Sequence, residues 1–282
     1  MTTITTPIKR LERRLADSGF PKAFIKTVMP DWWDKSLGES AQSILMLKMH
    51  LSKHLGLDLA SLVDDAKSVR LAPAGHTHYR LTQSKSKKDV VVAQSLAESL
   101  ARLVASATPK PYVPIPKNPE EVRREILNTN KWVSLEALID YLWEHGVPVI
   151  HLKQLPAGAK KFDGMVVDVD GRPVIVLTRV NKAPAWQLFI LAHETGHIGN
   201  GHVDKGAVFF DEKVEGSDKD KKEEEATEYG MHLLTRVKDA QAALKEPPGQ
   251  YSAPEYITEV LYQKIDLDLL PEDSKDILER LM

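Results

Sequence analysis

A His-Glu-Thr-Gly-His pentapeptide at residues 193–197 carries the residue types in this chain that are best suited to metal chemistry. Four positions separate His193 from His197, so on an α-helix both imidazoles lie on one face and can bind one Zn²⁺ together. Glu194 stands beside them, where it can accept a proton from a water molecule that the metal activates. We therefore predict His193 and His197 as zinc ligands and Glu194 as the catalytic base of a metal-assisted peptide hydrolysis.

The residues around the pentapeptide predict the helix that this chemistry needs. An apolar run at residues 185–192 precedes it, and Gly-Asn-Gly at residues 199–201 follows as a helix stop. Helical spacing places Trp186, Phe189 and Ile190 on the face of the first histidine, where we expect them to bury it. The competing interpretation is a pair of ordinary hydrogen-bonded histidines, which is less favoured because buried helix faces rarely carry such groups without a partner.

A catalytic zinc ion needs a third protein ligand and an open coordination position. The candidate segment is Glu223-Glu224-Glu225-Ala226, at the start of a second predicted helix whose Ala226 faces inward. One turn back from Ala226, Glu223 lies near the inner face, whereas Glu225 lies on the flank and Glu224 points away. We predict Glu223 as the third ligand and Glu225 as the second candidate; the alternative is a solvated acidic helix start, which the helix dipole favours.

The two motifs together resemble the ImmA/IrrE-type zinc metallopeptidases, small gluzincin-like enzymes with HExxH on one helix and Glu-x-x-Ala on a later one. The resemblance covers roughly residues 119–240. The similar parts are Asp163-Gly164, the strand Val174 to Leu177, the stretch Phe189 to His197 and the stretch Glu223 to Leu234. The sequence departs from the family at Thr227, where Asn is usual, and at Thr235-Arg236, where Met-Pro is frequent.

The resemblance implies a role for each matching residue and a class of substrate. His193, His197 and Glu223 would bind zinc, and Glu194 would be the general base. The substrate would be a protein, typically a DNA-binding repressor encoded nearby, or an antitoxin if the chain belongs to a toxin–antitoxin or phage-defence pair. The alternative function is a DNA- or partner-binding regulator in which the zinc site is structural or inactive.

The predicted elements divide the chain into two domains of an α+β protein. Residues 1–107 form a mainly helical, basic domain, weakly similar to helix-turn-helix recognition domains, with helices expected at 8–16, 21–28, 40–55, 58–63 and 90–104. Five prolines in the twelve residues from Thr108 to Pro119, the last included, predict an extended linker over residues 108–118. Residues 119–282 form the metallopeptidase domain, which we expect to be small and zincin-like, with a short β-sheet packed on the HExxH helix.

Within this second domain, residues 164–178 predict a β-hairpin that turns at Asp170-Gly171. Either Met165 to Val167 or Val174 to Leu177 could be the open strand edge on which an extended peptide pairs across the metal. The charged segment between Gly201 and Lys222 is either a lid over the site or a solvated loop. Four residues are candidates for stabilising the reaction's oxyanion, namely His202, Tyr229, His232 and Arg236.

Composition and charge set the cellular context that we expect. The absence of cysteine excludes disulfides and thiolate zinc fingers, and no apolar run reaches the length of a membrane span. The N-terminus lacks the apolar region of a signal peptide, so we expect a cytoplasmic protein without membrane contact. Residues 1–118 carry 18 Lys and Arg against 10 Asp and Glu, whereas the remainder is acidic.

The basic balance of the first half has two interpretations. It could bind nucleic acid, with Arg10, Arg13 and Arg14 and the predicted polar loop at residues 83–88 as first contacts. It could instead be a surface that docks on the acidic half of the same protein, and this second interpretation is the one that we favour.

Overall fold

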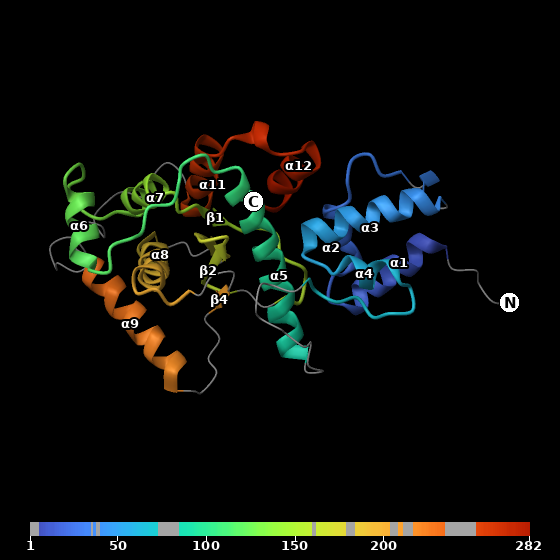
Figure 1. The fold of residues 1–282 in the computed structure, drawn as a ribbon, viewed down its shortest axis with the longest axis horizontal. Coiled ribbons are helices and arrows are strands. Elements are labelled where there is room, and N and C mark those ends of the chain that lie inside the picture. The colour runs from blue at the N-terminus through green and yellow to red at the C-terminus, as the bar shows by residue number, and fades with distance from the viewer. Residues whose placement is uncertain are drawn as a thin grey trace. The chain divides into compact units, whose positions relative to one another are not determined.

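Helices dominate the chain and accompany one small mixed β-sheet, so the expected α+β class is confirmed (Figure 1). This computed structural model describes residues 6–34, 36–37, 40–72, 85–159, 162–178, 184–203, 208–210, 217–234 and 252–282. For residues 85–89, 184, 208–210 and 217–220 it describes the backbone but not the side chains. No helix among these ranges is long and apolar enough to cross a membrane.

The chain forms two compact units, and their boundaries differ from the predicted domains. Unit 1 comprises Met1–Leu103, Lys153–Lys161 and Leu270–Met282, and unit 2 comprises Val104–Leu152 and Phe162–Leu269. The predicted linker at residues 108–118 is extended but belongs to unit 2, where hydrogen bonds to its backbone hold it. Val113 N donates to His145 O over 2.8 Å, and the Arg172 guanidinium donates to Lys110 O over 2.8 Å.

Unit 1 is built from helices that the amphipathic pattern largely predicts. They are α1 (Pro7–Asp17), α2 (Lys22–Thr27), α3 (Ala41–Leu55), α4 (Leu59–Val63), α5 (Lys85–Ser106, which continues into unit 2) and α12 (Glu272–Leu281). Ser40 caps α3 by accepting from Ser43 N, and Gly56 ends it with φ of 64°. The predicted loop at residues 83–88 is wrong from Lys85 onward. That residue already begins α5, since lysine has a high helix propensity.

The C-terminal helix α12 completes the core of unit 1, although it is the last element of the chain. Ile277, Leu278 and Leu281 are buried, and Leu281 O accepts hydrogen bonds from the backbone of Lys153 and Gln154. A boundary read from the order of elements along the sequence could not reveal this return of the chain.

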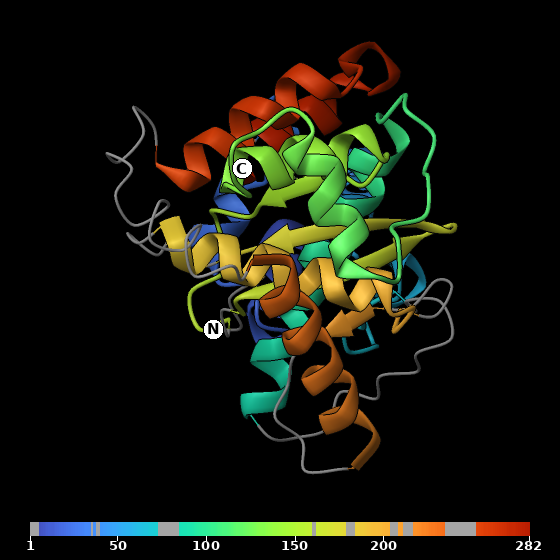
Figure 2. The same ribbon diagram turned by 90° about the vertical axis from the view of Figure 1, so that its left-hand side faces the viewer.

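Unit 2 contains the sheet and the helices of the two motifs. Its elements are α6 (Pro119–Leu127), α7 (Leu135–Glu144), β1 (Val149–His151), β2 (Gly164–Val169), β3 (Arg172–Leu177), α8 (Pro184–Gly199), β4 (Val208–Phe210), α9 (Ser217–Leu234), α11 (Ala253–Lys264) and the 3₁₀ helix η2 (Leu267–Leu269). Helix α8 packs against β2 and β3, and α9 crosses α8 (Figure 2).

The sheet has the order β1-β3-β2-β4, and it contains the predicted hairpin of β2 and β3. Asp170 (φ of 53°) and Gly171 (φ of 89°) form its turn in the left-handed region that such hairpins require. The predicted open edges are wrong, because β3 pairs with β1 and residues 165–167 of β2 pair with β4. Among the described strands, β1 and β4 are the outer ones. Strand β4 lies inside the segment predicted as a lid or loop, and its three residues are too few for a periodic signal.

Candidate metal centre

Helices α8 and α9 approach each other closely because small residues lie where they cross. A Cβ on Gly196 would lie 2.7 Å from Ala226 O and 3.0 Å from Ala226 Cα. One turn away, a Cβ on Gly230 would lie 3.1 Å from His193 N. Ala226 is fully buried at this contact, as the sequence predicts. The crossing therefore brings Glu223, which lies one turn before Ala226 on α9, close to the histidines of α8.

His193, His197 and Glu223 converge at this crossing, as the sequence predicts. The Nε2 atoms of the two histidines are 3.0 Å apart. Glu223 Oε2 lies 3.3 Å from His193 Nε2, and Glu223 Oε1 lies 3.7 Å from His197 Nε2. Ligand atoms around a tetrahedral zinc ion, with metal–ligand distances of 2.0–2.1 Å, are about 3.3 Å apart. The three residues are thus positioned to hold a metal ion.

A chain of hydrogen bonds leads to this centre, from Glu225 to His202 and from His202 to His197. Glu225 Oε2 is 2.9 Å from His202 Nε2, and His202 Nδ1 is 3.0 Å from His197 Nδ1. Burial lowers the pKa of His202, and the His202 hydrogen bond lowers the pKa of Glu225, so a neutral imidazole donates to a carboxylate. His202 Nδ1 then accepts from His197 Nδ1–H, which leaves the lone pair of His197 on Nε2, facing the centre.

A matching contact orients the other histidine. Thr227 Oγ1 is 3.2 Å from His193 Nδ1, and when Nδ1–H donates to this hydroxyl the His193 lone pair is also on Nε2. Thr227 is one of the positions at which the sequence departs from the family pattern, and it contacts a predicted ligand. With both Nε2 lone pairs facing each other, a cation between them removes their repulsion. The carboxylate atom Glu223 Oε1 is buried and makes no hydrogen bond to any described residue, which fits a donor set for a cation.

Glu225, the second candidate for the third ligand, does not join the converging atoms. Its carboxylate accepts from His202 and lies 3.6 Å from Lys221 Nζ. Glu224 lies outside the cluster as well, and it lines an adjacent pocket. Of the three glutamates, only Glu223 converges with the two histidines, and its role as a metal ligand stays a prediction.

Glu194 is buried beside the predicted ligands, with its carboxylate over the first residue of β2. A Cβ on Gly164 would lie 2.7 Å from Glu194 Cγ and 2.8 Å from Cδ. Only glycine at position 164 leaves room for the side chain in this place. Sequence reasoning noted this glycine as part of the family pattern but gave no physical reason for it.

An aromatic stripe runs along α8 away from the metal centre. The ring centroids of Phe189 and His193 are 6.5 Å apart, and those of Trp186 and Phe189 are 5.7 Å apart. The sequence predicts that Trp186, Phe189 and Ile190 bury His193. Ile190 is buried, but Trp186 is 42% exposed, and His193 is only partly buried, with 13% of its side chain exposed. Helical spacing assigns a residue to a face, but it does not tell how far neighbouring elements extend along that face.

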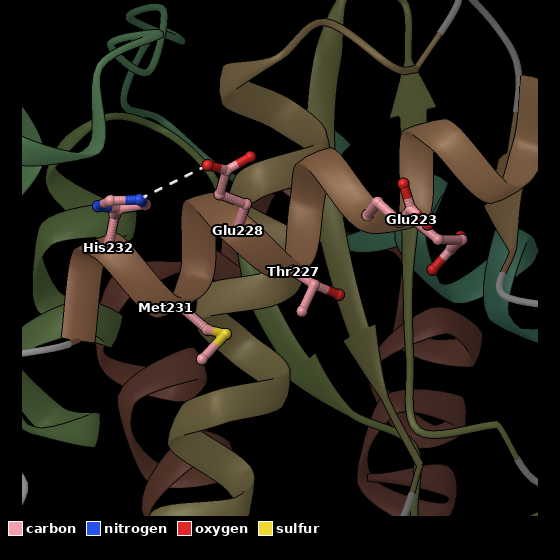
Figure 3. Close-up of a pocket in the computed structure, with 6 residues that line it drawn as sticks. Glu223, Thr227, Glu228, Met231 and His232 are labelled. Atoms are coloured by element: carbon pink, nitrogen blue, oxygen red, sulfur yellow. Dashed lines mark ion pairs between the residues drawn. The ribbon is translucent and has the colours of Figure 1, made fainter.

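An open pocket lies along α9, next to the proposed third ligand (Figure 3). Its lining residues are Glu223, Glu224, Thr227, Glu228, Met231 and His232. Figure 3 shows Glu223 and Thr227 towards one end, and the ion pair of Glu228 and His232, with 3.7 Å between Oε1 and Nε2, at the other. Of the three converging residues, the pocket is lined by Glu223.

Three of the four oxyanion candidates have other partners or lie at a distance from Glu223 among the described residues. The hydroxyl of Tyr229 donates to Pro116 O over 2.7 Å, and His202 lies behind His197. His232 is nine residues beyond Glu223, about 13 Å along a helix that rises 1.5 Å per residue. The fourth candidate, Arg236, is outside the described residues.

Comparisons with protein-family models, with curated proteins and with solved structures find no match for this chain.

Proposed function

We propose that this protein is a zinc-dependent endopeptidase of the ImmA/IrrE type, with His193, His197 and Glu223 as metal ligands and Glu194 as general base. The observation that carries the proposal is the convergence of two histidine Nε2 atoms and a glutamate carboxylate within 3.7 Å of one another. Two imidazoles and one carboxylate are the ligand set of several zinc peptidases, and they leave one position open.

The roles of the residues follow from their chemistry. A bound zinc ion would supply Lewis acidity at the scissile carbonyl and would lower the pKa of the attacking water. Glu194 accepts the proton of that water and later returns it to the leaving amine nitrogen. Gly164 keeps the Glu194 carboxylate in place, while Thr227 and His202 orient the two imidazoles.

The surroundings of the site favour a peptide chain as the substrate. The exposed Trp186 and the adjacent Phe189 form an apolar wall that leads to His193, and the pocket along α9 is open to solvent. Among the described strands β4 is an outer one, and an extended segment could pair with its backbone groups. By the family resemblance, the substrate is a DNA-binding repressor.

The proposal is tested with a Glu194→Gln variant, because a neutral amide cannot accept the proton but keeps the size of the side chain. Zinc-loaded wild-type protein and the variant are each incubated with a mixture of unfolded proteins and with the repressor encoded nearest to the gene. New N-termini are then counted by mass spectrometry. We expect wild type to generate new N-termini and the variant to generate none at equal zinc content. Equal cleavage by the two proteins, or cleavage by neither, contradicts the proposal.

A further inference from the structure

Helix α3 carries a second pair of histidines four residues apart, His50 and His54, in unit 1. Both side chains are buried, and their ring centroids are 4.5 Å apart. The carboxylate of Asp273, in the first turn of α12, reaches both of them. Asp273 Oδ2 lies 3.2 Å from His54 Nε2 and 3.6 Å from His50 Nδ1. The three ligand atoms all lie within 4.8 Å of one another.

The hydrogen bonds of His50 fix which of its nitrogens faces the carboxylate as an acceptor. His50 Nε2 is 3.0 Å from the carbonyl oxygen of Val28, so this nitrogen carries the hydrogen and donates it. The lone pair is therefore on Nδ1, which is buried and makes no hydrogen bond to any described residue. A ring whose one nitrogen donates to a backbone carbonyl while the other is open is the usual state of a metal-binding histidine.

We propose that His50, His54 and Asp273 form a second metal site, which binds a divalent transition-metal ion such as Zn²⁺ and links α3 to α12. The site is independent of the one on α8 and α9, because it lies wholly within unit 1.

Two imidazole nitrogens and one carboxylate favour zinc, cobalt, nickel or copper over magnesium and calcium, which prefer sets of oxygen ligands.

Lys53 is the cation that competes for the same carboxylate. Its ammonium lies 3.5 Å from Asp273 Oδ1 and 2.9 Å from Ser274 Oγ. The Lys53 side chain is 47% exposed, so it can turn into solvent when a metal ion binds. The structure thus contains an ion pair that a metal ion can replace, and removal of Lys53 should tighten metal binding.

The experiment measures zinc bound per chain in the full-length His193→Ala, His197→Ala double variant, which lacks the site in unit 2. Equilibrium dialysis against buffered zinc, followed by metal analysis, should find about one zinc ion per chain by the count of ligand sets. Adding Asp273→Asn should weaken this binding at least tenfold, in line with the roughly 10- to 100-fold effect of losing even an outer partner of a ligand.

Asp276→Asn is the matched control, since it makes the same change three residues later on α12 and should leave the zinc affinity unaltered. Lys53→Met is a second control, which should bind zinc more tightly. Circular dichroism melting, with and without zinc, checks that each variant is folded, and zinc should raise the Tm of the double variant but not of its Asp273→Asn derivative.

The proposal is overturned if the folded double variant binds no zinc. It is also overturned if Asp273→Asn and Asp276→Asn change the zinc affinity equally. Neither result bears on the peptidase proposal, which is read from cleavage by wild type and by Glu194→Gln.

Discussion

The absence of a side chain at Gly164 leaves room for the carboxylate of Glu194, and a Gly164→Ala substitution tests this role. In Gly164→Ala the new Cβ would lie 2.7 Å from Glu194 Cγ, so the glutamate side chain must move. We expect peptide hydrolysis to fall by about 100-fold, which is the typical cost of misplacing a reacting group by 1 Å. Zinc content should stay at the wild-type level because no ligand changes. A folded, zinc-loaded variant with wild-type turnover would show that Glu194 does not act from this position.

In the proposed metal centre, His202 has a supporting role without being one of the predicted ligands, because it accepts from Nδ1–H of His197. In His202→Ala this acceptor is lost, and the His197 ring can rotate or change its tautomer. We expect zinc affinity at the centre to fall by about 10- to 100-fold, the usual effect of removing an outer partner. Glu225→Gln should weaken binding much less, since an amide oxygen still accepts from His202. Competition titration with a chromophoric chelator measures the zinc affinity of both variants. An unchanged zinc affinity in His202→Ala would refute the role of the hydrogen bond between His202 and His197.

At the scale of elements, the close contact of α8 and α9 determines whether Glu223 reaches the histidines. The substitution Gly196→Ala tests the contact between the helices. It has two opposing effects on the stability of the folded protein. Alanine in place of a helix glycine is favourable by about 1 kcal/mol, whereas an inserted methyl group in a packed interface costs about 1–3 kcal/mol. The new Cβ would meet backbone atoms of Ala226 at 2.7 Å and 3.0 Å, which cannot turn aside, so the cost should prevail.

The Gly196→Ala variant should therefore unfold at lower urea concentration than wild type and bind zinc more weakly, because α9 and Glu223 move away from α8. Urea unfolding and zinc titration of the same sample provide both values. A variant that is more stable than wild type, with unaltered zinc affinity, would mean that the helices are less closely packed than described.

Helix α5 carries a buried carboxylate, Glu98, whose protonation links stability to pH. Burial raises the pKa of Glu98 above 4.5, although Gln94 donates to its carboxylate over 3.1 Å. The folded state therefore holds the proton more tightly than the unfolded state. The stability that the neutral carboxyl provides is present below pH 4.5 and is lost as pH rises through the raised pKa.

Because glutamine is neutral at every pH and retains the acceptor for Gln94, Glu98→Gln should be more stable than wild type at pH 7. The difference should vanish below pH 4.5. Thermal melts between pH 4 and pH 7 measure it, and a difference that is constant over this range would contradict the assignment of a raised pKa.

At the scale of the whole molecule, the basic first half of the chain is not a unit by itself. A fragment that ends near Thr108 lacks residues 153–161 and α12, which belong to unit 1. Arg14, one of the proposed phosphate contacts, donates instead to Asp65 and to the carbonyl oxygens of Leu62 and Asp64. DNA binding by the first half stays a prediction, and its test requires the full chain.

The sequence predicted most of the elements and the convergence of His193, His197 and Glu223, because these depend on local periodicity and on two short motifs. Ser40 and Gly56 mark the ends of α3, and helix spacing distinguishes Glu223 from its two neighbours. Sequence reasoning missed features that depend on distant packing. Strand β4 has only three residues, and α12 returns to unit 1 from the end of the chain.

His202 and Asp273 are two further residues whose contacts could not be predicted from the sequence, because they depend on packing. His202 is placed behind His197 by a turn that follows α8, and no spacing rule indicates this. Asp273 lies 219 residues after His54, so their contact depends on how α12 packs on α3.

The most direct test of the central claim compares Glu223→Gln with Glu224→Gln, adjacent residues that receive the same isosteric change. The measurement is the number of zinc ions bound per chain at one buffered zinc concentration, in full-length protein. Because only Glu223 faces the two histidine Nε2 atoms, we predict that Glu223→Gln holds one zinc ion fewer than Glu224→Gln, by the ligand count of the centre. Glu224→Gln should equal wild type. Equal zinc content in the two variants would contradict the assignment of Glu223 as the third ligand, and with it the proposed catalytic centre.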